Sequence, residues 1–359
     1  MKFNTKVNTI PSLTWNWLRM NHGMLDIDCD YKEKLNYSIS KLPKGVFFEK
    51  DAEKFLMTMP PVDSAMGKDF SQLLFDNRII PSAMVIDFAE KIEKPVYYNF
   101  DCKDKAYSIS SHIIEARKDS TVTVIMNFTS DEKAQGLQIV QTKLYARKNA
   151  KIHLITVQTL GKNYIHLNDI STFCEENANI EVTQIELGSQ KAYCGVDSIL
   201  REYQSSFKSN TAYFTRKDQE LDMNYVVKHI GRKTECEMMV YGTLKDNAKK
   251  TYRGTIDFRN GCQGSVGNEQ EETLLLNPQV VNKSIPVILC DEEDVAGEHG
   301  STIGKLSNEV LFYMNSHGIS KEEAEKIMTL SKINRVSSLI TDDKIKSKIQ
   351  EYVEEAFNE

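Results

Sequence analysis

A polar turn followed by a short β-rich run recurs along the middle of the chain at a nearly constant interval. The unit begins at Arg117, again at Arg147 and again at Glu175, so the intervals are 30 and 28 residues, and a looser copy begins at Leu244. An interval of this length is close to one long coil of a β-solenoid, in which every coil stacks on the coil before it. The recurrence therefore predicts a stacked parallel β-helix.

The β-rich region has clear boundaries in the sequence. Short runs rich in Val, Ile and Thr fill residues 78–304, and helical periodicity is almost absent there. A β-sandwich would need tight hairpin turns between neighbouring strands, yet the one Asn-Gly pair, Asn260-Gly261, comes late in this region. We therefore expect a mainly β chain with a β-helix core at 78–304, an N-terminal helical or irregular region at 1–77 and a C-terminal helical region at 305–359.

The C-terminal region carries clear helix signals. Ser320 followed by Glu323 forms a capping box, in which each side chain satisfies the free amide of the other residue at a helix start. Apolar residues between 343 and 357 recur with the spacing of one helical stripe. We expect this helical tail to cap the open edge of the solenoid and to offer a docking surface.

The charge balance and the absence of long apolar runs narrow the function classes. The chain of 359 residues has 45 Lys and Arg against 51 Asp and Glu, a net charge of −6, which disfavours nucleic acid as a partner. No run of about 18 apolar residues occurs, and the first residues have no unbroken apolar stretch like that of a secretory signal. We expect a cytoplasmic protein that does not enter a membrane.

The seven cysteines argue against a disulfide framework. Their number is odd and no C-x-x-C pair occurs, which also disfavours a finger-type zinc site. We expect most of them to be reduced thiols, and the default expectation for each is a small buried apolar side chain. The chain also lacks the phosphate-binding loop ending in Gly-Lys-Ser/Thr and the Gly-x-Ser-x-Gly and His-Glu-x-x-His hydrolase signatures, so no motif indicates an autonomous enzyme.

One segment concentrates potential metal ligands. Between Cys290 and His299 lie a thiol, five carboxylates and an imidazole. Thiolate and imidazole suit iron or zinc, whereas carboxylates suit harder ions. In a strand, however, Glu298 and His299 would point to opposite faces. From residue types alone, both a metal site and an acidic solvated loop followed by a structural histidine stay open.

The stretch from Glu298 to Ala324 resembles the C-terminal signature of the SufB/SufD family of iron–sulfur cluster assembly proteins. The shared pattern is a His-Gly-Ala-Thr-like turn, here His299-Gly-Ser-Thr302, then Leu311-Phe-Tyr313 and a Gly-Ile-Ser before an acidic helix. The resemblance implies a right-handed parallel β-helix with helical regions at both ends. It also implies a non-catalytic scaffold that dimerises through the end of the β-helix, with a SufB-like subunit or a second copy of itself.

The resemblance further implies a partner and a cargo. Family members hold an ABC-type ATPase, SufC, on the C-terminal helices, and the assembled complex builds a cluster from iron and persulfide sulfur. The iron–sulfur cluster would thus be transient, at an interface of the complex, with no cofactor in the isolated chain. We expect the docking surface to use six apolar residues: Leu311, Phe312, Tyr313, Ile319, Ile327 and Ile333.

Two departures from the SufB pattern indicate a SufD-like member. SufB-type members carry a second Glu where this chain has Gly300, and a cysteine near the position of Glu271. The resemblance maps the interface histidine of SufD-type members onto His299, which makes it the leading candidate for cluster assembly. Glu298 and Glu271 are weaker metal candidates.

Cys290 and Cys262 are weak candidates for accepting sulfur, because a buried, inert thiol is the better expectation for each. The alternative function is a β-helix enzyme acting on polysaccharide, a lyase or a hydrolase, which would use acidic residues in a solenoid groove. Such enzymes are mostly secreted, and the missing signal and the cysteine pattern weigh against this alternative.

Overall fold

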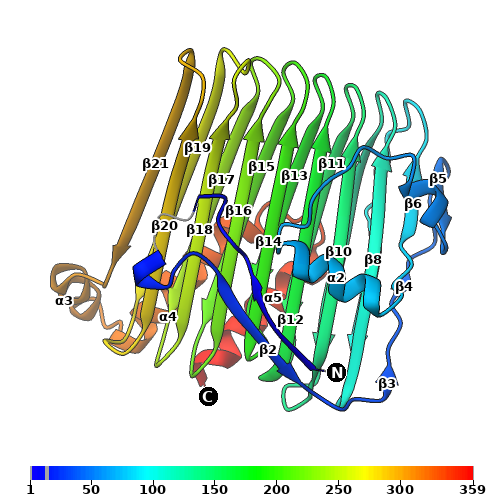
Figure 1. Cartoon of the computed structure of the whole chain (residues 1–359). Coiled ribbons are helices and arrows are strands. Elements are labelled where there is room, and N and C mark those ends of the chain that lie inside the picture. The colour runs from blue at the N-terminus through cyan, green and yellow to red at the C-terminus, as the bar shows by residue number, and fades with distance from the viewer. Residues whose placement is uncertain (1, 13–15, 359) are drawn as a thin grey trace.

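Two large parallel sheets form the body of the molecule. The computed structural model describes residues 2–12 and 16–358, and Figure 1 shows the successive coils side by side. From β6 to β21, each strand pairs with the strand two positions away in the chain, so these strands alternate between the sheets. The parallel β-helix predicted from the recurring turns is confirmed.

We call the two sheets the even sheet and the odd sheet after their strand numbers. The even sheet runs through β6 (Ser82–Ile86), β8 (Ala106–Ala116), β10 (Gln135–Ala146), β12 (Asn163–Cys174), β14 (Lys191–Leu200), β16 (Glu220–His229), β18 (Lys249–Phe258) and β20 (Val281–Cys290). The odd sheet runs through β7 (Val96–Cys102), β9 (Thr121–Ser130), β11 (Lys151–Thr159), β13 (Asn179–Glu186), β15 (Ser206–Thr215), β17 (Glu235–Leu244), β19 (Ser265–Leu275) and β21 (Val295–Gly304).

The strand register reproduces the spacing of the sequence. Thr121 pairs with Lys151, which pairs with Asn179, so the same 30- and 28-residue intervals separate equivalent positions in space. Side chains at matching positions therefore stack in ladders. Val124, Leu154 and Val182 form one such ladder inside the solenoid, and all are fully buried in its main apolar core.

The recurring polar turns form a second kind of ladder. Asp119, Asn149 and Asn177 each have a positive φ, between 55° and 62°, a backbone conformation that Asn and Asp tolerate better than other side chains. The Asn149 amide donates to Asp119 Oδ1 at 2.7 Å, and the Asn177 amide donates to Asn149 Oδ1 at 2.9 Å. The turn residue thus sets the local backbone and also ties each coil to the next.

The two ends of the solenoid differ. At the first coil, the short strands β4 (Ser38–Ile39) and β5 (Val46–Glu49) pair antiparallel with β7 and β6 and close both sheets. At the last coil, β20 and β21 each pair on one side only, with β18 and β19. Nine of the ten residues of β21 are exposed, so this end is open.

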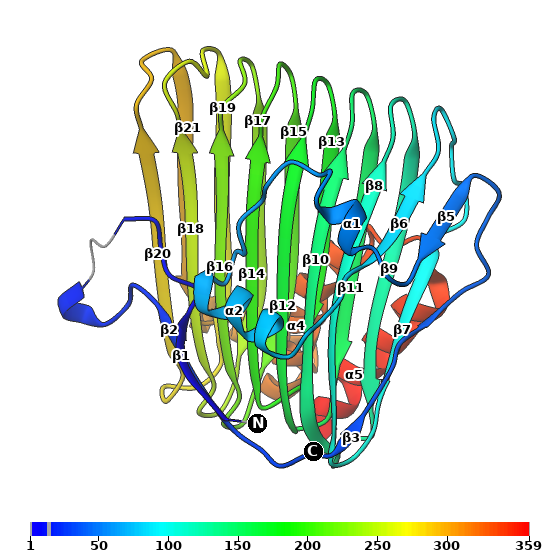
Figure 2. The ribbon, with the colours of Figure 1, turned by 45° about the vertical axis from the view of Figure 1, so that its right-hand side comes forward.

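The N-terminal region contains more strand than the helical or irregular structure that we expected. The strands β1 (Lys2–Val7) and β2 (Gly23–Asp28) form an antiparallel ribbon across the outer face of the even sheet (Figure 2), and β3 (Glu33–Lys34) pairs with β8. Helical segments are short: η1 (Asn16–Leu18), α1 (Glu53–Leu56) and α2 (Lys68–Asp76). The α2 helix buries its apolar face, including Phe70, against this outer face.

Three helices follow the last strand: α3 (Asn308–Ser316), α4 (Lys321–Ser337) and α5 (Asp343–Asn358). The side chain of Ser320 accepts a hydrogen bond from the Glu323 amide at 3.2 Å, as the capping signal predicts. The prediction that the tail caps the open edge is wrong for α4 and α5, which pack on the outer face of the odd sheet around Ile333 and Ile349. The apolar stripe of α5 requires a flat apolar partner, and this sheet face provides it.

No helix within residues 2–12 and 16–358 has the length and apolarity needed to cross a membrane.

The turn ladder leads to a stability prediction. Asn149→Ala should destabilise the fold by about 3 kcal/mol, because it removes two hydrogen bonds and forces a Cβ-bearing residue without a polar side chain into a positive φ. Asn149→Gly removes the same hydrogen bonds but accepts this φ, so its loss should be smaller by about 1 kcal/mol. Urea unfolding of the two variants measures the difference, and equal losses would contradict the role assigned to the backbone.

Candidate functional site

The open end of the solenoid brings together two residues that the sequence singled out, Glu271 and His299, and three other polar residues. We call this place the lumen mouth and define it by Lys250 of β18, Glu269 and Glu271 of β19, and His299 and Ser301 of β21. These residues come from the last coils, and alternation along each strand directs them to the interior. In β19, positions 265, 267, 269, 271 and 273 are all buried, which identifies the inward face.

A buried ion pair lies just inside the mouth. Lys250 Nζ contacts Glu271 Oε1, and the two side chains are 0% and 2% exposed. Lys250 also donates to Ser284 Oγ at 3.3 Å, while Glu271 accepts from Thr273 Oγ1 at 3.0 Å and from Ser301 Oγ at 3.4 Å. Burial lowers the pKa of Lys250, and the neighbouring Glu271 opposes that shift. A buried charge pair is tolerable only with such additional hydrogen bonds.

Glu269 is a second buried carboxyl beside this pair. Burial raises its pKa to about 8, and the charge of Glu271 adds to the shift. The carboxyl therefore keeps its proton at neutral pH. It lies against Gly254 of the opposite sheet, where an added Cβ would come within 2.3 Å of Glu269 Oε1, so only glycine leaves room for it.

The structure separates Glu298 from His299, as strand alternation predicts. Glu298 pairs in register with Asn268 and His299 pairs with the inward-facing Glu269, so the histidine is on the lumen face and the glutamate is on the outer face. Both are exposed because no further coil covers β21. Glu271 pairs in register with Ser301 and is buried.

The lumen mouth of one chain does not complete a metal site. Among residues 2–12 and 16–358, no group of three or more His, Cys, Asp or Glu side chains is placed to hold a metal ion. His299, Glu298 and Glu271 are therefore not a common ligand set within this chain. The mouth combines an imidazole at the rim, a protonated carboxyl and a compensated ion pair, which can bind or transfer protons and can add ligands to a site that another surface completes.

The two candidate thiols differ in accessibility. Cys262 is fully buried, and burial raises its pKa, as expected for an inert thiol. The expectation that Cys290 is buried is wrong: it is exposed at the end of β20, because no coil follows, and its thiol lies 3.0 Å from the Glu292 carbonyl oxygen. Of the two, Cys290 alone is open to reaction.

A thiol and an imidazole that the sequence analysis did not single out also meet near the last coils. His229 Nε2 is 3.2 Å from Cys236 Sγ, and both residues are buried. Burial lowers the pKa of His229 to about 3 and raises that of Cys236 to about 12, so both groups are neutral. They pack the interior and do not form a reactive thiolate–imidazolium pair.

The predicted docking residues divide between surface and core. Phe312 and Tyr313 are 75% and 64% exposed on α3, a helix that buries none of its residues. Ile327 is exposed on α4, and Leu311 and Ile319 are half-buried. Ile333 is fully buried against the odd sheet and cannot belong to a docking surface, because the helix uses that face to hold itself on the solenoid.

Sequence reasoning missed Lys250 and Glu269. A signal for Glu269 was present: between Ser265 and Thr273 inward and outward positions alternate, and Glu269 and Glu271 both fall on the inward positions. A carboxyl group on the inward face needs either a buried cation or a proton. The sequence could not show which lysine supplies the cation.

Comparisons with known proteins agree with this architecture. The family model described as "SUF system FeS cluster assembly, SufBD core domain" matches residues 100–331. An iron–sulfur cluster assembly SufBD family protein of Staphylococcus epidermidis is 27% identical over 195 residues, and the iron–sulfur cluster assembly protein SufB of Bacillus subtilis is 26% identical over 195 residues. Each match covers 54% of this chain and 42% of the relative, so the similarity spans about two fifths of the length of these relatives.

The raised pKa of Glu269 leads to a pH prediction. Its ordinary value is 4.5, so between about pH 4.5 and pH 8 the folded chain holds a proton that the unfolded chain releases. The wild type should therefore lose stability relative to Glu269→Gln as pH rises, by about 1 kcal/mol per pH unit within this window. Urea unfolding of both proteins at several pH values measures this difference, and a difference that is constant with pH would refute the buried, protonated carboxyl.

Proposed function

The chain belongs to the SufBD family of iron–sulfur cluster assembly proteins, and we propose that it is a SufD-like scaffold subunit of a SUF-type assembly complex. In this proposal it dimerises through the open end of the β-helix, with a SufB-like subunit or a second copy, and docks a SufC-like ABC ATPase on its C-terminal helices. The iron–sulfur cluster is the cargo, built transiently at the interface, and this subunit itself is not an enzyme.

The open last coil is the observation that carries the proposal. β20 and β21 present backbone amides and carbonyls on an unpaired edge, a surface that another strand can extend. The first coil has no equivalent edge because β4 and β5 close it. An end-to-end dimer would bring a second surface to His299 and would supply ligands that one chain lacks.

The residue at position 271 supports the SufD-like assignment. Where SufB-type members carry a cysteine, this chain has Glu271, and its carboxylate is bound to the fully buried Lys250. A carboxylate engaged in this way offers neither a nucleophile nor a free ligand for sulfur chemistry. The thiol in the complex would therefore come from the partner subunit.

The state of the cysteines is consistent with a cytoplasmic complex. Five free thiols are buried and a sixth, Cys290, is exposed. Reduced thiols without disulfide partners are typical of proteins in a reducing compartment. The family match favours cluster assembly over the polysaccharide-active enzyme that the sequence left as an alternative.

Docking of the ATPase can be tested on α3. The double variant Phe312→Ser/Tyr313→Ser should weaken ATPase binding at least about tenfold, since buried aromatic anchors often dominate an interface. It should not lower the melting temperature, because both side chains are exposed in the isolated chain. Phe75→Ser on α2 is a matched control with 77% exposure, remote from α3. Co-purification and calorimetry measure the binding, and unchanged affinity in the double variant would place the dock elsewhere.

The role of His299 can be tested in the assembled complex. His299→Ala should leave the melting temperature, the dimer seen by light scattering and ATPase docking unchanged, because the side chain is exposed on the last strand. Cluster formation, followed by its visible absorbance, should fall at least about tenfold if the imidazole binds iron or transfers a proton. Thr302→Ala, an exposed residue on the outward face of the same strand, is the control.

A wild-type rate of cluster formation in His299→Ala would remove His299 from the site. A monomeric wild-type chain that also fails to pair with a SufB-like subunit would contradict the proposed use of the open edge.

A further inference from the structure

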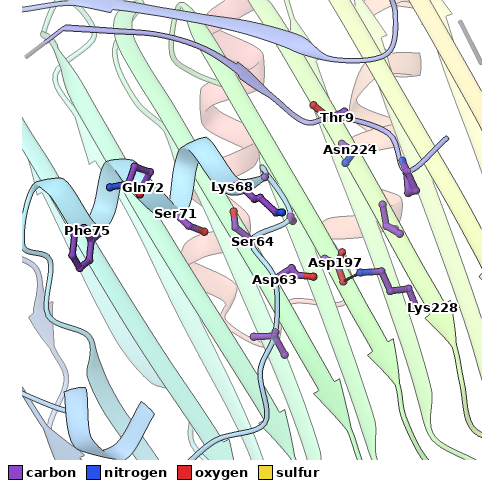
Figure 3. A pocket seen from close by; sticks show the side chains of 15 residues that line it. Thr9, Asp63, Ser64, Lys68, Ser71, Gln72, Phe75, Asp197, Asn224 and Lys228 are labelled. Carbon is purple, nitrogen blue, oxygen red and sulfur yellow. Dashed lines mark hydrogen bonds and ion pairs between the residues drawn. The ribbon is translucent and has the colours of Figure 1, made fainter. Parts of the chain in front are cut away.

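A cavity of about 750 Å³ lies on the outer face of the even sheet, outside the lumen. Its floor is formed by β14 and β16, and its walls by the N-terminal segment around Thr9 and by residues 62–75, which include α2 (Figure 3). The assembly function proposed above uses none of these residues. This volume is within the range of small-molecule pockets.

The floor carries a buried pair of opposite charges. Lys228 Nζ donates to both carboxylate oxygens of Asp197, at 2.7 and 3.0 Å, and the two side chains are 20% and 11% exposed. Asp63 approaches the same carboxylate from the wall, and Figure 3 shows it pointing toward Asp197. Burial and the charge of Asp63 raise the pKa of Asp197, while Lys228 opposes the shift.

An amide on the floor lacks a partner. Asn224 is 1% exposed and lines the cavity, and its Oδ1 has no hydrogen-bond partner among the described residues. Figure 3 shows the Asn224 side chain between Thr9 and Asp197. A buried amide oxygen without a partner is unfavourable, and a ligand that donates a hydrogen bond to it would remove this cost.

The cavity is held in shape before any ligand enters. The buried Asp169 accepts hydrogen bonds from Ser64 Oγ at 3.0 Å and from the Met66 amide at 2.9 Å, which fixes the wall segment to the sheet. The backbone N–H of Asn8 donates a hydrogen bond to the Met66 carbonyl at 3.2 Å, and this bond joins the two walls. A preformed site loses little conformational entropy on binding.

We propose that this cavity binds a free α-amino acid as its zwitterion. The lining holds two carboxylates, Asp63 and Asp197, and two ammonium groups, Lys68 and Lys228, so its net charge is close to zero while both signs are present. The two carboxylates would repel a simple anion, and the two lysines would repel a simple cation.

A zwitterion satisfies both sets of charges. Its ammonium group faces Asp197 and Asp63, its carboxylate faces Lys228, and the Asn224 amide binds either group. The apolar lining at Val226 and Val62 receives the side chain of the ligand.

The test adds the twenty common L-amino acids, one at a time, to the whole chain. Each is present at about 10 mM, a concentration at which weak, millimolar binding is detectable. At least one should raise the melting temperature by about 2 °C at ten times its dissociation constant. Calorimetry then compares that amino acid with the acid lacking its amino group and with the amine lacking its carboxylate. Both analogues should bind at least about tenfold more weakly.

Two variants assign the binding to this cavity. Asn224→Leu should weaken binding at least about tenfold, and Asp197→Leu/Lys228→Met, which removes both charges together and leaves none unpaired, should do the same. The matched control is Glu220→Leu/Lys249→Met, an exposed ion pair on the same sheet at 2.8 Å, which should bind like the wild type.

No binding by any amino acid, equal binding of either analogue, or wild-type affinity in both cavity variants would each overturn the proposal. None of these results bears on cluster assembly.

Discussion

Every strand of this solenoid satisfies its backbone hydrogen bonds through the coil before it and the coil after it. Because the strands of one coil lie in different sheets, a single coil cannot stabilise itself, and the stack must be closed or continued at each end. The chain closes its first end with the antiparallel strands β4 and β5 and leaves β20 and β21 without a cover. The place available for assembly is thus a direct result of how coils are hydrogen-bonded.

The same stacking determines what the lumen contains. Residues about 30 positions apart become neighbours, so a polar group in one coil meets the groups of the next coils at the same height. Glu271 receives Lys250 from across the lumen and Ser301 from the following coil, and this is why two charges can be fully buried near an open end. Alternation places Glu269 on the same inner face without a cation of its own, and it keeps its proton instead.

The fold could be predicted from the sequence because the repeat is local. Arg117, Arg147 and Glu175 mark the coils, and the capping residue Ser320 marks a helix start, and each of these signals depends only on neighbouring residues. The packing of α4 and α5 on the odd sheet could not be predicted, since an amphipathic stripe does not specify which apolar surface it meets. For the same reason Ile333 looked like a docking residue although it is in the core. The site was predictable at His299, where the sequence signature is continuous, but not at Lys250, whose partner lies 21 residues away in another sheet.

The N-terminal ribbon has a consequence for the order in which the chain folds. Asn8 donates to Asp222 Oδ1 at 2.8 Å, and Arg253 donates to the Met20 carbonyl at 2.7 Å, so the segment that carries the ribbon binds coils that come much later in the chain. Coils can stack one after another as they are made, but the hydrogen bonds of Asn8 with Asp222 and of Arg253 with Met20 must wait for more than 200 further residues. Closing so long a loop is slow. The ribbon is therefore a late element that locks a stack already built, and during synthesis its strands are a free edge that other chains could reach.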